Sequence, residues 1–264
     1  MRNTESGLVQ SVGRAASILE MMAGGEGELG VTELGRRLGV HKATASRLVA
    51  TLADHGLVEQ NPATDKYRLG LGLVRLAGAA TAGMDLVRLA RPVLEELAER
   101  TRETVNLAVL DGDLVMNVDQ IAGARSVASV SWVGRRTPCH CTSNGKVLLA
   151  FLDDVERERS LSLPLRSFTS NTITDPDLLR AELMEVRARG YARTVEEFED
   201  GLNAVAAPIR RADGEVLAAV SVAGPAFRMR PAELPGIARH VVDTAATISG
   251  RLGYVERRQF VGGG

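Results

Sequence analysis

The sequence of 264 residues lacks long hydrophobic runs, has two cysteines, and contains 3% aromatic residues. No apolar run approaches the roughly 20 residues of a membrane-spanning helix, and we expect no secretory signal at the start of the chain. We therefore expect no membrane partner. Cys139 and Cys141 cannot build a disulfide scaffold and fit a reducing cytoplasm, which is the location we predict. Scarce aromatics disfavour a single-strand binder, because such proteins stack bases on aromatic side chains.

Lysine is also scarce, and the chain has no large excess of either positive or negative charge. The chain has 32 basic and 33 acidic residues and a net charge of −1, so its total charge gives no sign of a nucleic-acid partner. The charge is not evenly placed, however. Residues 31–70 hold six basic and four acidic residues, and residues 36–47 hold four basic residues and no acidic one. This local excess favours contact with a phosphate backbone.

Residues 1–70 have the pattern of a winged helix-turn-helix domain. Apolar spacing predicts a helix over residues 11–23, followed by a glycine-rich loop over 24–30. A short helix follows, with Thr32 as its N-cap and Gly39 just past its end. A third helix runs from Lys42 to about His55, and two short strands flank a turn at residues 61–65.

The third helix is the candidate DNA-reading element. The opposite face and the helix start are polar, and the face that should pack inward consists of Ala45, Leu48, Val49 and Leu52. Such a helix can enter the major groove, and the wing can reach a flanking phosphate or the minor groove. The alternative is a charged face that only improves solubility. The predicted DNA-binding residues are Arg36, Arg37, His41, Lys42, Thr44, Ser46, Arg47, Lys66 and Arg68.

The rest of the chain mixes strands and helices. Residues 71–84 lack proline and serine, so we expect an interdomain linker helix that continues into an amphipathic helix over 85–102. Turn signals at 111–113 and 213–214 predict two antiparallel hairpins, and helices are expected over 145–152, 175–189 and 231–252. Residues 85–264 therefore predict an α+β domain with an antiparallel sheet, not a doubly wound one.

Three separated segments resemble the IclR family of bacterial transcriptional regulators. They are VTELGRRLGVHKATASRLVATLADHGLVEQ with KYRLG, then VGRRTPCHCTSNGKVLLAFL, then EEFEDGLNAVAAPIRRADGEVLAAVSVAGP. The resemblance covers nearly the whole chain. It implies a winged-helix domain, a linker helix that dimerises, and a GAF-like domain at 85–264 that binds an effector and oligomerises. It further implies dimers or tetramers on palindromic double-stranded operators of a metabolic operon, more often as a repressor, with operator affinity altered by a small metabolite.

The resemblance also assigns effector-binding residues. It places the effector loop at Ser143, Asn144 and Gly145, where backbone amides at a helix start suit a carboxylate or another acceptor-rich ligand. Thr194 and Ala223 depart from residues found in some relatives, which leaves the ligand open. Trp132 either packs in the core or stacks on the ligand. On the opposing wall the pattern falls on Thr194, Glu196, Asn203, Ala204, Ser221 and Ala223.

Two other functions are compatible with parts of the sequence. Cys139, His140 and Cys141 could bind Zn²⁺ or form a redox-sensitive pair, giving a metal or thiol sensor. In an extended segment, however, both cysteines face one side and His140 the other. An enzyme on a GAF-like domain is the weaker alternative, because no phosphate loop or nucleophile elbow is present. Glu196, Glu197 and Glu199 are more typical of a solvated helix or loop than of a carboxylate pair. We expect no cofactor, no bound metal and no catalysis.

Overall fold

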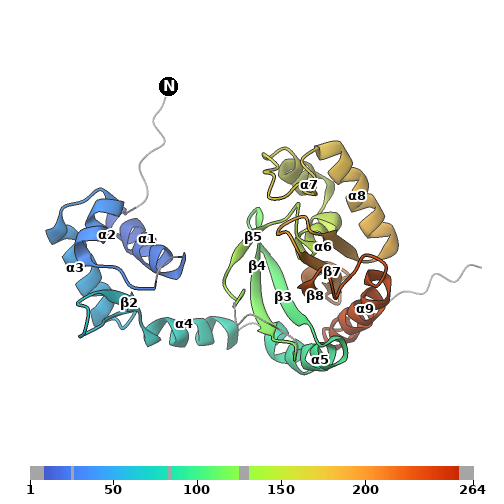
Figure 1. The fold of residues 1–264 in the computed structure, drawn as a ribbon. Coiled ribbons are helices and arrows are strands. Elements are labelled where there is room, and N and C mark those ends of the chain that lie inside the picture. Colours follow the sequence, from blue (N-terminus) through green and yellow to red (C-terminus); the bar gives the residue numbers. More distant parts are fainter. Residues whose placement is uncertain (1–8, 25–26, 83–84, 125–130, 256–264) are drawn as a thin grey trace, which may run out of the picture. The chain divides into compact units, whose positions relative to one another are not determined.

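The computed structural model describes residues 9–24, 27–82, 85–124 and 131–255 (Figure 1). The chain folds into two compact units, Met1–Met84 and Asp85–Gly264. The N-terminal unit has one hydrophobic core, and the C-terminal unit has two. None of the helices in the described ranges is both long and apolar enough to span a bilayer.

The N-terminal unit is a three-helix cluster with a two-stranded wing, as the sequence predicts. It contains α1 (Gln10–Gly24), α2 (Val31–Leu38), α3 (Lys42–Asp54), β1 (Val58–Gln60) and β2 (Tyr67–Leu69). Gly39 ends α2 in the left-handed conformation (φ 64°), which lets the chain turn sharply into α3. The predicted N-cap at Thr32 is wrong. The helix begins at Val31, with Gly30 in the capping position, two residues before Thr32.

The wing is tied back to the loop that follows α1. Val58 pairs with Leu69 and Gln60 with Tyr67 in an antiparallel register. Leu29 and Tyr67 exchange two backbone hydrogen bonds of 2.9 Å, so the loop residue extends this small sheet. The chain then enters α4 (Leu71–Ala82), as predicted; residues 83 and 84 of the expected linker lie outside the described residues.

The C-terminal unit is a six-stranded antiparallel sheet with helices on both faces, which confirms the α+β prediction (Figure 1). Its strand order is β5-β4-β3-β8-β7-β6. The predicted hairpins are β3 with β4 and β7 with β8. The strands are β3 (Thr104–Asp111), β4 (Leu114–Ile121), β5 (Arg136–Pro138), β6 (Ala192–Val195), β7 (Leu202–Arg210) and β8 (Val216–Pro225).

Alternation along the strands gives the sheet two separate cores. Val105, Val205 and Val220 face α5 (Asp85–Thr101) and α9 (Leu234–Arg251). Ala206 and Ala219 face the other way, toward α6 (Ser143–Phe151) and α8 (Pro176–Arg189). The residues of β7 and β8 on this second face are small, which leaves room above the sheet next to α6.

Two helices of this unit begin at other residues than the sequence predicts, and three elements were not predicted. The helix expected from Gly145 begins at Ser143, because the Thr142 hydroxyl caps it by accepting a hydrogen bond from the Gly145 amide. The C-terminal helix begins at Leu234, with a proline in its first turn. Helix α7 (Asp154–Leu161) and the short strands β5 and β6 were not predicted.

Candidate nucleic-acid interface and ligand cavity

Helix α3 presents one buried and one exposed face, in agreement with the predicted pattern. Ala45, Val49 and Leu52 are buried in the core of the N-terminal unit. The predicted reading residues lie on the solvent side. These exposed residues are His41, Lys42, Thr44, Ser46 and Arg47.

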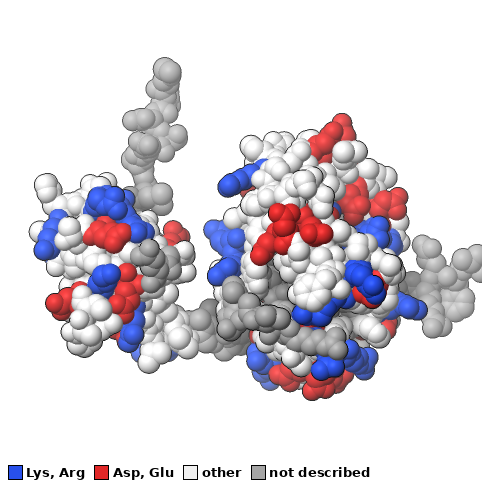
Figure 2. Space-filling view, in the orientation of Figure 1, with Lys and Arg blue, Asp and Glu red and all other residues white. Residues whose placement is uncertain are grey.

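Some basic residues of this unit form ion pairs with carboxylates, and others do not. Arg37 is hydrogen-bonded to Glu33, and Arg68 Nε lies 2.7 Å from Glu59. Among the described residues Lys42, Arg47 and Lys66 form no ion pair. In Figure 2 basic and acidic side chains lie side by side on this unit. The charges available to a phosphate are therefore those of α3 and the wing tip more than those of α2.

A cavity of about 530 Å³ lies in the C-terminal unit, between the start of α6 and the face of the sheet with small residues. Strands β6, β7 and β8 contribute Thr194, Ala204, Ser221 and Ala223 to its lining. Strands β3 and β4 contribute Asn106, Asn117 and Gln120. Where the sheet borders the cavity, β6 to β8 thus present small side chains, and β3 and β4 present amides.

A β-bulge places the amides of β4 on one face. Asn117 and Gln120 are three residues apart, so strict alternation would point them to opposite sides. The register between β3 and β4 shifts between Leu107 and Ala108. Because of this bulge, Asn117 and Gln120 both line the cavity. Asn106 lies opposite Gln120 on β4 and opposite Ser221 on β8.

The first turn of α6 closes another side of the cavity. Ser143 and Asn144 are buried and line it, and their backbone amides belong to the start of the helix. These amides have no partner within the helix, and the helix dipole makes this end favourable for an anion. The site can therefore hold a carboxylate through backbone donors.

Aromatic and charged side chains also line the cavity. Trp132 packs edge-on to Phe198 with ring centroids 6.1 Å apart, and its backbone amide donates to the Gln120 side chain over 2.7 Å. The Arg135 guanidinium lies 5.2 Å from the Trp132 ring centroid. Arg228 donates to both carboxylate oxygens of Glu103, at 2.6 and 2.9 Å.

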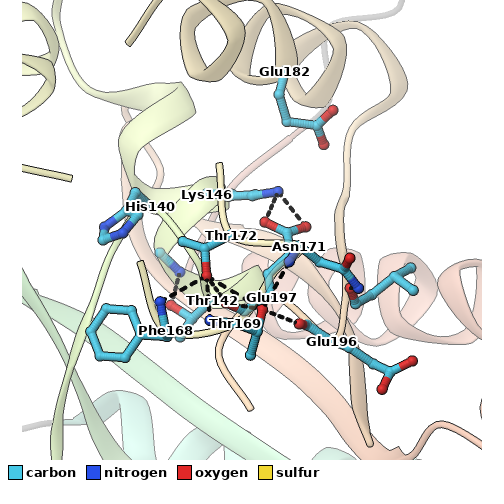
Figure 3. Close-up of polar contacts among 12 residues, drawn as sticks. His140, Thr142, Lys146, Phe168, Thr169, Asn171, Thr172, Glu182, Glu196 and Glu197 are labelled. Atoms are coloured by element: carbon cyan, nitrogen blue, oxygen red, sulfur yellow. Dashed lines mark hydrogen bonds and ion pairs between the residues drawn. The ribbon is translucent and has the colours of Figure 1, made fainter. Parts of the chain in front are cut away.

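A buried ion pair joins α6 to the loop that carries Phe198 (Figure 3). Lys146 is 1% exposed, and its Nζ lies 2.7 Å from Glu197. The threonines Thr169 and Thr172 donate to the backbone oxygens of Glu196 and Glu197. Burial raises the pKa of Glu197, against the opposing effect of Lys146. The expectation that Glu197 lies in solvent is therefore wrong.

Comparisons with known proteins agree on one family. The family model for the IclR helix-turn-helix domain matches residues 11–62, and the model for the C-terminal domain of bacterial transcriptional regulator IclR matches residues 78–250. The chain belongs to the IclR family.

Its relatives are transcriptional regulators, and the sequence match extends over nearly the whole length of each. The chain is 34% identical to the HTH-type transcriptional regulator XynR of Escherichia coli, covering 94% of this chain and 98% of that protein. It is 40% identical to the regulator Rv1719 of Mycobacterium tuberculosis, covering 89% and 90%. The IclR homolog of Microbacterium hydrocarbonoxydans, solved with 4-hydroxybenzoate, is 30% identical, covers 92% of this chain and 98% of that chain, and superimposes with a TM-score of 0.82.

The structure separates the predicted effector residues into two groups. Gly145, Glu196 and Asn203 do not line the cavity. A side chain at Gly145 would meet the Cys139 backbone at 2.3 Å, so this glycine permits close packing. Asn203 is fully buried and joins Met229 to the Glu196 amide. The residues that do line it are Trp132, Ser143, Asn144, Thr194, Ala204, Ser221 and Ala223.

Sequence reasoning missed the amide half of this IclR-type cavity. Asn106 and Asn117 each interrupt an apolar strand sequence, TVNLAVL and LVMNVDQI, and both are buried. A polar residue within an apolar strand is a usable signal, because a buried amide needs a partner. Arg135, Phe198 and Arg228 had no comparable signal, since loops position them.

The segment of Cys139, His140 and Cys141 is not extended, and the prediction that both cysteines share a face is wrong. Cys141 lines the cavity, whereas Cys139 and His140 line a smaller one of about 250 Å³. Burial raises the pKa of each thiol to about 12. Within the described ranges no cluster of three or more histidine, cysteine or acidic residues could hold a metal ion. These observations weigh against the metal or thiol sensor.

Proposed function

We propose that this IclR-family regulator is a ligand-responsive repressor of a metabolic operon. A small effector would occupy the cavity of the C-terminal domain and change the affinity of the helix-turn-helix domain for its operator. The observation that carries this proposal is the start of α6, where the buried residues Ser143 and Asn144 line a cavity in a chain that also carries a helix-turn-helix. An effector shifts operator binding only if it binds the two functional states unequally.

A carboxylate is the group that this site would hold best. Backbone amides at a helix start supply donors and a favourable dipole without a fixed counter-charge. The relative from Microbacterium hydrocarbonoxydans was solved with 4-hydroxybenzoate, which carries a carboxylate. That protein is 30% identical to this chain, so its ligand supports the chemical class and not the identity.

The proposed regulator would act as a homo-oligomer on a palindromic operator in the bacterial cytoplasm. Two recognition helices would then read half-sites about 34 Å apart, or a multiple of that. We assign residues 1–70 to DNA binding, 71–84 to the linker and 85–264 to effector binding and oligomerisation. Helix α4 exposes Leu71 and Val74, at 79% and 67%, which supports a role for the linker in pairing. The relatives include the glycerol operon regulatory protein of Streptomyces coelicolor, in keeping with a metabolic target.

Gel-shift titration against DNA upstream of the chain's own gene and its neighbours tests DNA binding. Thermal-shift screening of small carboxylates and amides then supplies effectors for the same titration. A repressor predicts that deleting the gene raises transcription of the target. Salt-independent DNA binding, or an operator affinity that no bound compound changes, would contradict the proposal.

A substitution at the first residue of α6 isolates the backbone amide. Ser143→Pro removes one donor, and proline is tolerated at the first helical position. Thr142 is extended (φ −116°, ψ 145°), as a residue before proline should be. We expect Ser143→Pro to abolish the response to a carboxylate and to leave operator binding intact. Ser143→Ala, the matched control, keeps the amide and should respond.

A further inference from the structure

Three asparagines in the cavity carry amide oxygens without a partner. Asn106, Asn117 and Asn144 are 6%, 6% and 7% exposed, and all three line the cavity. Among the described residues, none of their Oδ1 atoms accepts a hydrogen bond. Buried polar side-chain atoms without partners are uncommon, and each one costs free energy. Three at one cavity indicate that something outside the protein completes them.

The asparagines approach the cavity from three elements, which are β3, β4 and α6. Asn106 is on β3 opposite Gln120, and Asn117 on β4 is opposite Ala108, so the two amides are diagonal neighbours on adjacent strands. Such positions lie roughly 7–8 Å apart in an antiparallel sheet. Asn144 comes from the first turn of α6, where the carboxylate is proposed to bind. A ligand that reaches all three must therefore carry polar groups along its length.

Hydroxyl groups suit these amides better than other ligand groups do. An amide donates through Nδ2 and accepts through Oδ1, and a hydroxyl does both, so it fits an asparagine in either orientation. A carboxylate only accepts hydrogen bonds. An alkyl chain or an unsubstituted ring edge would leave the amides unsatisfied. On the other half of the sheet, Ala204 and Ala223 offer a small apolar surface for the carbon skeleton.

We propose that the effector is a polyhydroxylated carboxylate of the sugar-acid class, whose hydroxyl groups hydrogen-bond to Asn106, Asn117 and Asn144. This inference rests on the proposed function for the existence of an effector and adds its chemical class. The carboxylate lies at the start of α6, and the hydroxyl-bearing chain extends over β3 and β4.

Binding to the full-length protein tests the class directly. Trp132 is the only tryptophan and lines the cavity, so its fluorescence reports binding without DNA. The matched pair is D-gluconate and hexanoate, which share a six-carbon chain and differ in their hydroxyls; D-xylonate, L-threonate, 4-hydroxybenzoate and xylitol complete the panel. We expect the best sugar acid to bind about 100-fold more tightly than hexanoate, and xylitol to bind weakly for want of a carboxylate. Equal or tighter binding of hexanoate or 4-hydroxybenzoate, or no binding of any sugar acid at millimolar concentration, overturns the inference.

Variants assign the effect to the asparagines. Asn106→Ala and Asn117→Ala should each weaken the best sugar acid about 5- to 10-fold and leave hexanoate unchanged. The melting temperature of the free protein should not fall, because an unsatisfied group is removed; Asn106→Ser serves if the alanine variant does not fold. Asn171→Ala is the control, since Asn171 is exposed and does not line the cavity. Equal losses for sugar acid and hexanoate would overturn the assignment.

Gel shifts separate this inference from the proposed function. If a sugar acid binds and operator affinity does not change, the regulatory proposal fails and the ligand class stands. If a compound of another class binds more tightly and changes operator affinity, the regulatory proposal stands and the ligand class is wrong.

Discussion

Lys146 Nζ lies 2.7 Å from Glu197, although the two residues are 51 positions apart in the sequence. Lys146 belongs to α6, whose first turn lines the cavity, and Glu197 precedes Phe198, which also lines it. Figure 3 shows Glu182 beyond the same lysine. The ion pair therefore ties the helix that would hold a carboxylate to the loop on another side of the cavity.

Removing one member of this pair should strongly destabilise the C-terminal domain. Lys146→Met leaves the Glu197 carboxylate buried without a counter-charge, and we expect a loss of about 3–5 kcal/mol in the free energy of unfolding. Urea unfolding followed by Trp132 fluorescence measures this loss in the C-terminal domain. The double variant Lys146→Met with Glu197→Leu should recover most of the stability, because neither charge then remains.

An exposed ion pair supplies the control for that experiment. The Arg211 side chain is 48% exposed and pairs with Asp213 and Glu215. Arg211→Met should cost less than about 1 kcal/mol, because water screens this pair. Losses of similar size in the two single variants would show that Lys146–Glu197 has no special role.

Local signals in the sequence predicted most of the fold. The turn at 111–113 predicted the β3–β4 hairpin, and Gly39 predicted the end of α2, because glycine there takes a conformation that few residues adopt. The missed elements have weaker signals. Strand β6 spans only Ala192–Val195, and its pairing with β7 is a long-range contact that no local pattern specifies.

The cavity was only partly predictable for a related reason. Family resemblance supplied Ser143, Asn144 and the small residues of β6 to β8, but not the amides of β3 and β4. The bulge between Leu107 and Ala108 decides which residues of β4 face the cavity, and a one-residue shift in register is not visible in the sequence. The burial of Glu197 likewise depends on Lys146, a distant partner.

Arg47 should contribute more to operator binding than Arg37. Arg47 is exposed on α3 without an ion pair in the described part of the chain, whereas Arg37 is held by Glu33. We expect Arg47→Ala to weaken operator binding by about 1–3 kcal/mol and to relax sequence preference, as for a base-edge contact. Gel-shift titration with operator and scrambled duplexes measures both effects. Arg37→Ala is the matched control, and an equal loss from both variants would contradict this ranking.

The cysteines should be dispensable for the effector response. Burial raises the pKa of Cys139 and Cys141 to about 12, so at neutral pH the reactive thiolate is scarce. Exchange of both for serine, or for alanine if serine is poorly tolerated, should leave the ligand-dependent change in operator affinity intact. Iodoacetamide labelling followed by mass spectrometry should be slow in the folded protein and fast in urea. Loss of the response in both double variants would favour a thiol or metal sensor instead.

His140 should make the C-terminal domain less stable in mild acid. Burial is the main cause that lowers its pKa below the usual 6.5, and the Lys146 charge acts in the same direction, against the hydrogen bond to the Arg166 carbonyl. Below pH 6.5 the unfolded chain therefore binds a proton that the folded chain resists, and stability falls as the pH drops. The slope can reach about 1.4 kcal/mol per pH unit.

Urea unfolding of the wild type and of His140→Gln at pH 7.5 and 5.5 measures how much the free energy of unfolding changes with pH. The variant should lose the part of this change that His140 causes. His240→Gln is the control, because His240 is exposed on α9, and an unchanged slope in His140→Gln would assign the acid sensitivity to other groups.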